Sequence, residues 1–181
     1  MAKYTFVVLT NAVDGKDDTF NEWYTNTHLG DVLAVPGVSW LVVFMGVNDL
    51  GMGFGIAEGP FADAMRALRP ATPITADALI AGYRQLIARA KARGIKVYAG
   101  TIAPYQGAAY YSTQGEAVRQ AVNDWMRNGK EFDAVLDFDA VLRDPANPAS
   151  MRADFHAGDH LHGNDAGYAA MAQSVDLRLF R

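Results

Sequence analysis

Runs of apolar and β-branched residues alternate along the chain with segments whose apolar positions recur at helical spacing. Four such runs predict strands, at residues 4–10, 39–45, 95–104 and 132–142. A continuous apolar run such as 39–45 is typical of a strand covered on both faces, as in a parallel sheet. The repeated strand–helix order predicts one α/β domain over residues 1–181, with a mainly parallel sheet of about four strands.

The intervals between these strands carry the signals that begin and end helices. Thr75 and Asp77 open a long helix that Gly94 terminates. The other predicted helices are 17–35, 61–69, 114–128 and 164–180, and the predicted loops are the Gly-rich segment 50–60 and residues 145–150. In an open α/β sheet, binding sites form at the carboxyl ends of the strands. Polar side chains there are therefore the first candidates for chemistry.

Composition narrows the classes of partner. The 181 residues carry a formal net charge of -4 and contain no cysteine. An acidic chain lacks the basic footprint of a nucleic-acid-binding protein and has no attraction to anionic membranes. Disulfides and thiolate chemistry are excluded. No stretch approaches the roughly 20 apolar residues of a membrane span, and the first apolar run is too short for a signal peptide. We therefore expect a soluble, cytoplasmic protein, and no cofactor is indicated.

The chemistry-bearing residues near the C-terminus are Asp159 and His162, in the stretch DHLHGNDAGY. An Asp can hold the imidazole tautomer while the His accepts a proton from a hydroxyl group. Asn48 follows the second predicted strand in the Gly-containing turn GVND, where its side-chain amide could donate to an oxyanion. Their placement after successive strands predicts one shared site.

Each of these signals has an alternative interpretation. An Asp-x-x-His pair often caps or opens a helix, and a Gly-x-Asn-Asp segment is often only a turn. A metal site is a second alternative, with ligands from His156, Asp159, His160 and His162. We do not adopt it, because His160 and His162 would point in opposite directions in an extended segment.

Residues from about 30 to 181 resemble the C-terminal two-thirds of an SGNH/GDSL-type hydrolase. The stretches that carry the likeness are WLVVFMGVNDLG (40–51), ITADALIAGYRQLIARAKARGIKVYAGTIAPYQG (74–107), residues 110–127 and 132–148, and GDHLHGNDAGYAAMA (158–172). The resemblance implies a three-layer, flavodoxin-like sandwich and an ester-hydrolysing Ser–His–Asp apparatus. On that pattern Asn48 corresponds to the oxyanion Asn, and Asp159 and His162 correspond to the acid and base. Gly163 stands where the family usually has Pro.

The beginning of the chain departs from that pattern. The family opens with a strand that ends in Gly-Asp-Ser, whereas the corresponding strand here continues into Thr10 and Asn11. The four serines, Ser39, Ser112, Ser150 and Ser174, all lie elsewhere. Thr10 is a candidate replacement because a His can activate a Thr hydroxyl, although a β-branched strand residue is the simpler interpretation.

Residues 1–38 are similar instead to the opening strand and helix of EthD-like, dimeric ferredoxin-like proteins. The likeness rests on Asn21-Glu22-Trp23-Tyr24, on His28-Leu29 and on Asp31-Val32-Leu33. We interpret the chain as a chimera, with an EthD-like segment at 1–38 joined to an SGNH-like part at 39–181. A sheet with fewer covering elements leaves edges that invite pairing, so a homodimer or higher oligomer is expected.

Two functions remain open at this point. In the first, Asp159, His162 and Asn48 hydrolyse a small ester weakly, with water or Thr10 as the attacking group, because the serine block is missing. In the second, the chain is a catalytically silent chimera that serves as a fold or an oligomerisation module.

Overall fold

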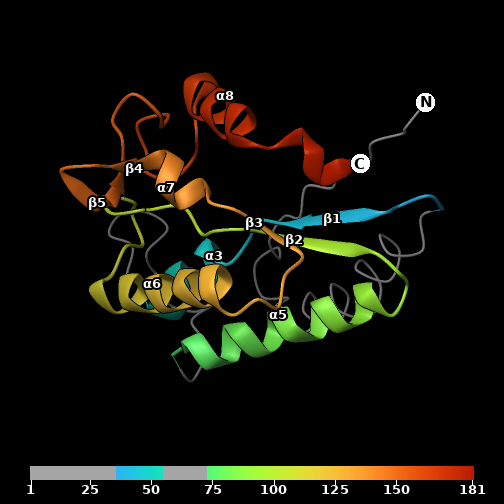
Figure 1. Cartoon of the computed structure of the whole chain (residues 1–181). Helices are drawn as coiled ribbons and strands as arrows, with labels where there is room; N and C mark the ends of the chain where they lie inside the picture. Colours follow the sequence, from blue (N-terminus) through green and yellow to red (C-terminus); the bar gives the residue numbers. More distant parts are fainter. Residues whose placement is uncertain (1–35, 55–72) are drawn as a thin grey trace.

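The computed structural model describes residues 36–54 and 73–181. Three predicted elements lie outside these ranges: the strand at 4–10, the helix at 17–35 and the short helix at 61–69. Thr10 lies outside them as well. The remaining strands and helices form the ordered arrangement drawn in colour in Figure 1.

The described part of the chain has a three-stranded parallel sheet. Strands β1 (Trp40–Val43), β2 (Lys96–Gly100) and β3 (Ala134–Leu136) lie in the order β1-β2-β3. Leu41 is opposite Val97, and Tyr98 is opposite Ala134. Because all three strands run the same way, their carboxyl ends meet at one edge. The prediction of an α/β fold with a parallel sheet is confirmed.

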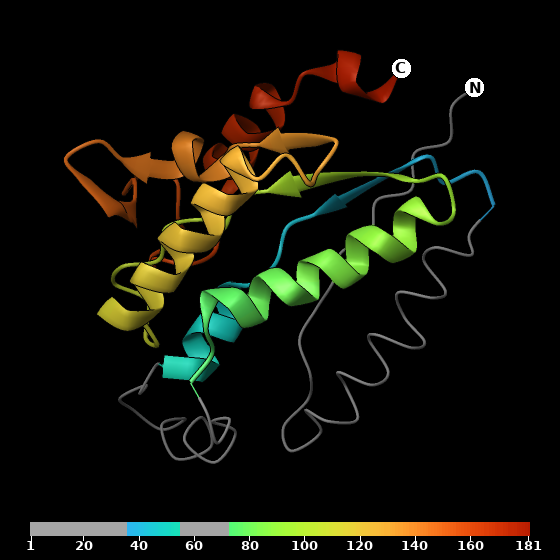
Figure 2. The same cartoon turned by 60° about the horizontal axis from the view of Figure 1, so that its bottom comes forward.

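Helices cover both faces of this sheet, which gives three layers (Figures 1 and 2). One face carries α3 (Val47–Phe54), α5 (Ala76–Lys91) and α6 (Thr113–Asn128). The other face carries α7 (Phe138–Leu142), α8 (Asp165–Ser174) and a 3-10 helix at Leu177–Phe180. A short antiparallel hairpin, β4 (Arg143–Asp144) and β5 (Asn147–Met151), follows α7.

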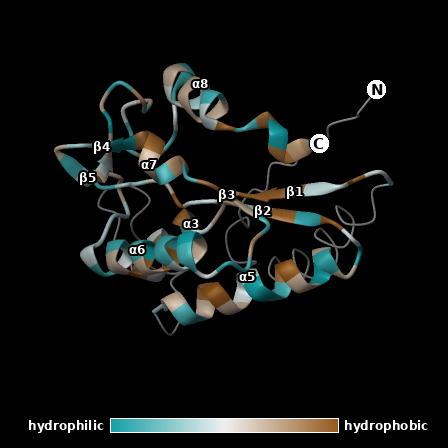
Figure 3. Cartoon of the chain, in the orientation of Figure 1, coloured by the Kyte–Doolittle hydropathy of each residue, from teal (hydrophilic) through white to brown (hydrophobic). Residues whose placement is uncertain are grey.

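The two long helices begin where their capping residues predict. The side-chain oxygen of Thr75 accepts a hydrogen bond from the amide of Ala78, and that of Ser112 accepts one from Gly115. Each bond satisfies one of the unpaired amides of a first helical turn. The buried residues of α5 are Tyr83, Leu86, Ile87 and Ala90, which repeat at helical spacing. Figure 3 shows the resulting alternation of hydrophobic and hydrophilic residues along this helix.

Several predicted boundaries are wrong, for local reasons. The run 132–142 is a three-residue strand followed by a helix, because the Asp137 carboxylate accepts a hydrogen bond from the amide of Ala140 and caps α7. A short apolar run does not distinguish a strand from a helix by periodicity. Residues 50–54 of the supposed Gly-rich loop belong to α3, and 147–150 of the supposed loop belong to β5.

The last helix is also shorter than predicted. Helix α8 ends at Ser174, and the chain then returns to the sheet through the 3-10 helix. The ring of Phe180 packs edge-on against Trp40 and Tyr98, at centroid distances of 6.0 Å and 5.3 Å. The Tyr98 hydroxyl donates a hydrogen bond to the carbonyl of Leu179. The last residues therefore cover part of β1 and β2.

Among the described residues, no helix is both long and apolar enough to cross a membrane.

Candidate active site

A cavity of about 170 Å³ opens at the carboxyl edge of the parallel sheet. Segments distant in sequence meet in its wall: the residues after β1, those after β2, the start of α3, the end of α7, β5, the loop 161–163 and α8. The lining residues are Phe44, Met45, Val47, Asn48, Ile102, Ala103, Pro104, Leu142, Met151, Leu161, His162, Gly163, Tyr168 and Met171. The wall is mostly apolar, and Asn48 and His162 are its principal polar side chains. The predicted convergence of these two residues is thus found in the structure.

Asn48 is held by a helix and not by the turn predicted from GVND. The chain leaves β1 and bends at Gly46, whose φ is 109°, before α3 begins at Val47. A Cβ at Gly46 would lie 2.9 Å from Ile102 Cδ1, so both the backbone angle and the space favour glycine. Asn48 is therefore the second residue of a helix that starts at the cavity. A helical position fixes a side chain more tightly than a turn does.

The Oδ1 atom of Asn48 accepts a hydrogen bond of 2.7 Å from the hydroxyl of Tyr110. Among the described residues, no group pairs with the Asn48 Nδ2 atom. The amide therefore retains a donor at the cavity wall.

Asp159 and His162 form a close pair. The Nδ1 atom of His162 lies 2.6 Å from Asp159 Oδ2, while Oδ1 accepts hydrogen bonds of 3.0 Å from the amides of Leu161 and His162. Asp159 therefore organises a local turn and does not cap a helix, because Asn164 caps α8. In the described part of the chain, the other imidazole nitrogen, Nε2, has no hydrogen-bond partner.

The electrostatics of this pair follow from its contacts. Partial desolvation acts to raise the pKa of Asp159, but the hydrogen bonds from the His162 ring and from two backbone amides lower that pKa to about 2. The carboxylate is therefore charged at neutral pH. The His162 side chain is 70% exposed and that of Asp159 is 45% exposed, so solvent reaches both groups.

The loop that carries this pair is closed at its base. His156 and Gly163 form an antiparallel bridge, in which the amide of Ala157 donates to the carbonyl of His162 at 3.0 Å. The Asn164 side chain donates to the carbonyls of Asp154 and His156 and accepts from the amide of Gly167. Asn164 thereby ties the start of α8 to the beginning of the loop. The position of His162 is fixed by this closure more than by its own packing.

None of the four serines is hydrogen-bonded to His162. Ser39 precedes β1 at the opposite edge of the sheet, and Ser112 caps α6. Ser150 lies on β5 and donates to the side-chain carbonyl of Gln106 at 3.3 Å, and Ser174 ends α8 with its hydroxyl bonded to the carbonyl of Met171. Each hydroxyl of the last three has a local structural role. Within the described residues, the cavity therefore offers no serine to the imidazole.

The alternative metal cluster at 156–162 is not assembled. The Nδ1 atom of His156 accepts hydrogen bonds from the amides of Gly158 and His160, and its ring stacks on that of His160 at 4.3 Å. Over residues 36–54 and 73–181, no group of three or more His, Asp or Glu side chains is arranged to share a metal ion.

Two features of the site were missed by the sequence. Tyr110 is not among the predicted site residues, but it holds Asn48. The apolar lining from Leu142, Met151 and Met171 was also missed, because these residues come from three separate elements that only the fold brings together. The adjacent tyrosines, Tyr110-Tyr111 after the third predicted strand, were the available signal for the first feature.

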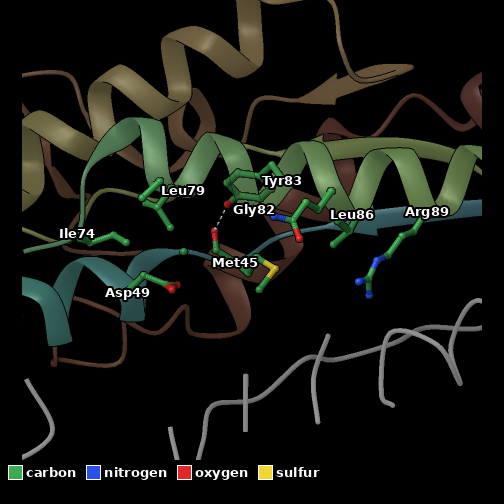
Figure 4. Close-up of a pocket in the computed structure, with 11 residues that line it drawn as sticks. Met45, Asp49, Ile74, Leu79, Gly82, Tyr83, Leu86 and Arg89 are labelled. Atoms are coloured by element: carbon green, nitrogen blue, oxygen red, sulfur yellow. Dashed lines mark hydrogen bonds between the residues drawn. The ribbon is translucent and has the colours of Figure 1, made fainter. Parts of the chain in front are cut away.

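A second cavity, of about 240 Å³, lies between α5, the start of α3 and Met45 (Figure 4). The Tyr83 hydroxyl crosses this region and donates to the carbonyl of Met45 at 2.8 Å. The cavity holds Asp49 and Arg89 but none of the three predicted site residues. The smaller cavity is therefore the one in which the predicted chemistry meets.

Comparison with known families gives a match that runs continuously over most of the chain. The model of the GDSL-like lipase/acylhydrolase family matches residues 3–170. The match includes most of the segment 1–38, and no finding supports the EthD-like resemblance of that segment. No curated protein sequence matches the chain significantly.

Proposed function

Because the chain belongs to the GDSL-like lipase/acylhydrolase family, we propose that it hydrolyses small esters slowly, with His162 as the general base. The observation that carries this proposal is the shared cavity. Asn48 and His162 line the same wall, and Asp159 lies 2.6 Å from the far nitrogen of the imidazole.

The three residues have complementary roles in this proposal. Asp159 accepts a hydrogen bond from the Nδ1–H group and so leaves Nε2 as the basic nitrogen. As an oxygen nucleophile attacks the ester carbonyl, Nε2 takes its proton. The Asn48 amide donates a hydrogen bond to the oxyanion that forms. When the tetrahedral intermediate collapses, the carbon–oxygen bond to the alcohol breaks and the imidazolium returns its proton to the leaving alkoxide.

The attacking group is water, which gives the free acid directly, or the hydroxyl of Thr10. In the second case the acyl group is transferred to Thr10, and a water molecule that gives its proton to His162 then hydrolyses this ester. Ser112, Ser150 and Ser174 are engaged in local hydrogen bonds, and Ser39 precedes β1 at the opposite edge of the sheet, which supports a nucleophile other than serine. Without a serine nucleophile, oxyanion stabilisation and binding alone typically leave rates about 10³–10⁴-fold above water. We therefore expect a weak esterase.

The cavity also favours a class of substrate. Its volume of about 170 Å³ is below the roughly 300–1,000 Å³ of sites for drug-sized ligands. Among the residues that the structure describes, its apolar lining contains no lysine or arginine to pair with a charged acyl group. A short, uncharged acyl group fits these properties, and hydrolysis should fall as the acyl chain is lengthened.

A comparison of nitrophenyl acetate hydrolysis by the wild-type chain and by His162→Ala tests the proposal. The wild type should exceed the variant at pH 7, and both should be assayed beside a heat-denatured sample to remove background. Equal rates for the two folded proteins would rule out ester hydrolysis with His162 as the general base.

The second candidate is a catalytically silent chimera that acts as a fold or an oligomerisation module. The engagement of Ser112, Ser150 and Ser174 in structural bonds favours this candidate, whereas the continuous family match from residue 3 weighs against a join near residue 38. Light scattering at high concentration tests the homo-oligomer that an oligomerisation module requires, and a single monomeric species would exclude that module.

A further inference from the structure

Tyr110 reaches Asn48 from a distant segment of the chain. The two residues are 62 positions apart, and the Tyr110 hydroxyl donates to Asn48 Oδ1 at 2.7 Å. Tyr110 belongs to the loop between β2 and α6, whereas Asn48 belongs to α3. Asn48 lines the smaller cavity and Tyr110 does not. The Tyr110 hydroxyl therefore contacts the Asn48 amide from outside the cavity.

An amide side chain presents an acceptor at one end and a donor at the other. Rotation by half a turn about its last bond exchanges the two ends, at little cost when nothing holds them. The Tyr110 hydroxyl occupies the acceptor end, and this leaves the Nδ2 donor for the cavity. We propose that Tyr110 is a positioning residue that holds the Asn48 amide with its donor toward the reacting carbonyl oxygen. This inference rests on the proposed function for its catalytic meaning.

The fold makes specific room for this contact. A Cβ added to Gly51 would lie 2.4 Å from Tyr110 Cδ2 and 2.6 Å from Cε2. Asn48 and Gly51 are three residues apart on α3 and so share one face of the helix. The absence of a side chain at Gly51 lets the tyrosine ring lie against the helix with its hydroxyl at Asn48.

The hydroxyl is also kept in its donor form. Burial raises the pKa of Tyr110, and the neighbouring Tyr105 and the Asp159 carboxylate raise it further. A phenolate could only accept a hydrogen bond. Because the pKa is raised, Tyr110 continues to donate to Oδ1 over the pH range in which an ester hydrolase is assayed.

The test compares Tyr110→Phe with Tyr111→Phe. The control removes a hydroxyl from the adjacent tyrosine, whose ring packs on Tyr105 at 5.2 Å and which is not bonded to Asn48. The first measurement is the side-chain amide resonance of Asn48 in a nitrogen–proton correlation spectrum, assigned by its loss in Asn48→Ala. It should shift and broaden in Tyr110→Phe and remain in place in Tyr111→Phe. An unmoved resonance in Tyr110→Phe would overturn the inference.

The second measurement is turnover of nitrophenyl acetate. Loss of one neutral hydrogen bond should lower kcat about two- to tenfold with KM unchanged, and Tyr111→Phe should not lower it. In an Asn48→Ala background, Tyr110→Phe should have no further effect, because the amide it positions is gone. An equal loss in both backgrounds would assign Tyr110 a merely structural role and overturn the inference.

The two measurements separate this inference from the proposed function. If the resonance responds to Tyr110→Phe but the wild type shows no His162-dependent turnover, Tyr110 still positions the amide and the esterase proposal fails. If turnover depends on His162 but neither the resonance nor kcat responds to Tyr110→Phe, the esterase proposal survives and this inference fails. Gly51→Ala, which displaces the same ring, should reproduce the shift of the Asn48 resonance.

Discussion

Two sets of paired charges flank the cavity, and they differ in exposure. In the first, which we call the Arg119 cluster, the Arg119 guanidinium pairs with Glu116 and Asp139 at 2.7 Å each, and Arg127 pairs with Asp139 and Asp137. Glu116, Arg119 and Asp139 are buried. The second set, Asp159 and His162, lies largely in solvent. Both sets contain short hydrogen bonds, so bond length alone does not distinguish their roles.

The difference lies in what each set leaves unpaired. Arg119 donates through its three guanidinium nitrogens, to Glu116, to Asp139 and to the carbonyl of Ile102. Burial acts to lower the pKa of Arg119, but its two carboxylate partners raise it overall. In the second set the imidazole retains, at the cavity, a nitrogen that pairs with no group in the described part of the chain. A saturated buried network supports structure, whereas an open exposed pair is available for chemistry.

The Arg119 cluster also positions the cavity. Asn123 on α6 accepts from the amide of Ile102 and donates to its carbonyl, at 2.8 and 2.9 Å. Thr101 donates to Asp137 and accepts from the amide of Asp139. The segment 102–104, which lines the cavity, is therefore held by polar groups on its far side. The charges that shape the site and the charges proposed to act in it are different residues.

The largest effect is expected from Arg119→Met. Removing the guanidinium leaves the buried Glu116 carboxylate without its cation. It also removes one of the arginines that pair with Asp139. Breaking a buried ion pair from one side costs about 3–5 kcal/mol. The free energy of unfolding, measured by urea denaturation at pH 7, should fall by that amount.

Arg84→Met is the matched control for that variant. The Arg84–Glu131 pair has the same 2.7 Å separation, but the Arg84 side chain is 56% exposed. Exposed ion pairs contribute about 0–1 kcal/mol. Equal losses from the two variants would contradict the distinction between a saturated buried cluster and an exposed pair.

The opposite pattern is expected for Asp159→Asn. The His162-dependent part of ester hydrolysis should fall by about 10²–10⁴-fold, since the imidazole loses the group that fixes its tautomer. The free energy of unfolding should change by less than about 1 kcal/mol, because the pair is exposed. Turnover of nitrophenyl acetate and urea denaturation of the same preparation measure the two quantities. A large loss of stability with unchanged turnover would mean that Asp159 is structural and not catalytic, which would contradict the distinction between the two sets.

The sequence predicted the layers, and it predicted that Asn48 and His162 lie close together, for identifiable reasons. Apolar runs such as 39–45 located the strands, and Thr75 marked where a long helix begins. Asn48, Asp159 and His162 follow strands or precede a helix, and the structure brings Asn48 and His162 to one cavity. The alternation of strand and helix was sufficient for this, because parallel strands place their carboxyl ends together.

The errors have physical causes of their own. The hydrogen bond that the Asp137 carboxylate accepts from the amide of Ala140 caps a helix in the second half of 132–142, and apolar periodicity does not encode that bond. Gly46 makes the turn expected at GVND, but α3 begins at the next residue. The Arg119 cluster joins residues of α6 to Asp137 and Asp139 at the beginning of α7. Such long-range pairing depends on the tertiary fold, which local sequence patterns do not specify.

The pH dependence of Asp159 sharpens the comparison further. Its folded-state pKa of about 2 is lower than the ordinary value near 4. The stabilisation it contributes is therefore complete above about pH 4 and is lost as the pH falls through about 2; exposure keeps it small. A carbon-detected NMR titration of the Asp159 carboxyl should give a midpoint near 2. In His162→Ala the midpoint should rise, while the two amide bonds keep it below the ordinary value. A midpoint unchanged by His162→Ala would mean that the pair does not form.

The smallest effect is expected at Gly163, where the loop enters α8. Gly163 has no positive φ, and a Cβ there would meet Tyr168 at 3.4 Å, an ordinary contact. Gly163→Ala should therefore stabilise the protein by about 0.4–1 kcal/mol, because it reduces the freedom of the unfolded chain.

Gly158, in the same loop, has a φ of 100°. Gly158→Ala should destabilise by about 1–2 kcal/mol, even though nothing lies within 4 Å of its added Cβ. Thermal unfolding of both variants measures the contrast. If Gly163→Ala destabilised the protein as much as Gly158→Ala, packing at Gly163 would constrain the loop in addition to the backbone angle at Gly158, and the exposed pair would lie in a more rigid setting than its solvent contact indicates.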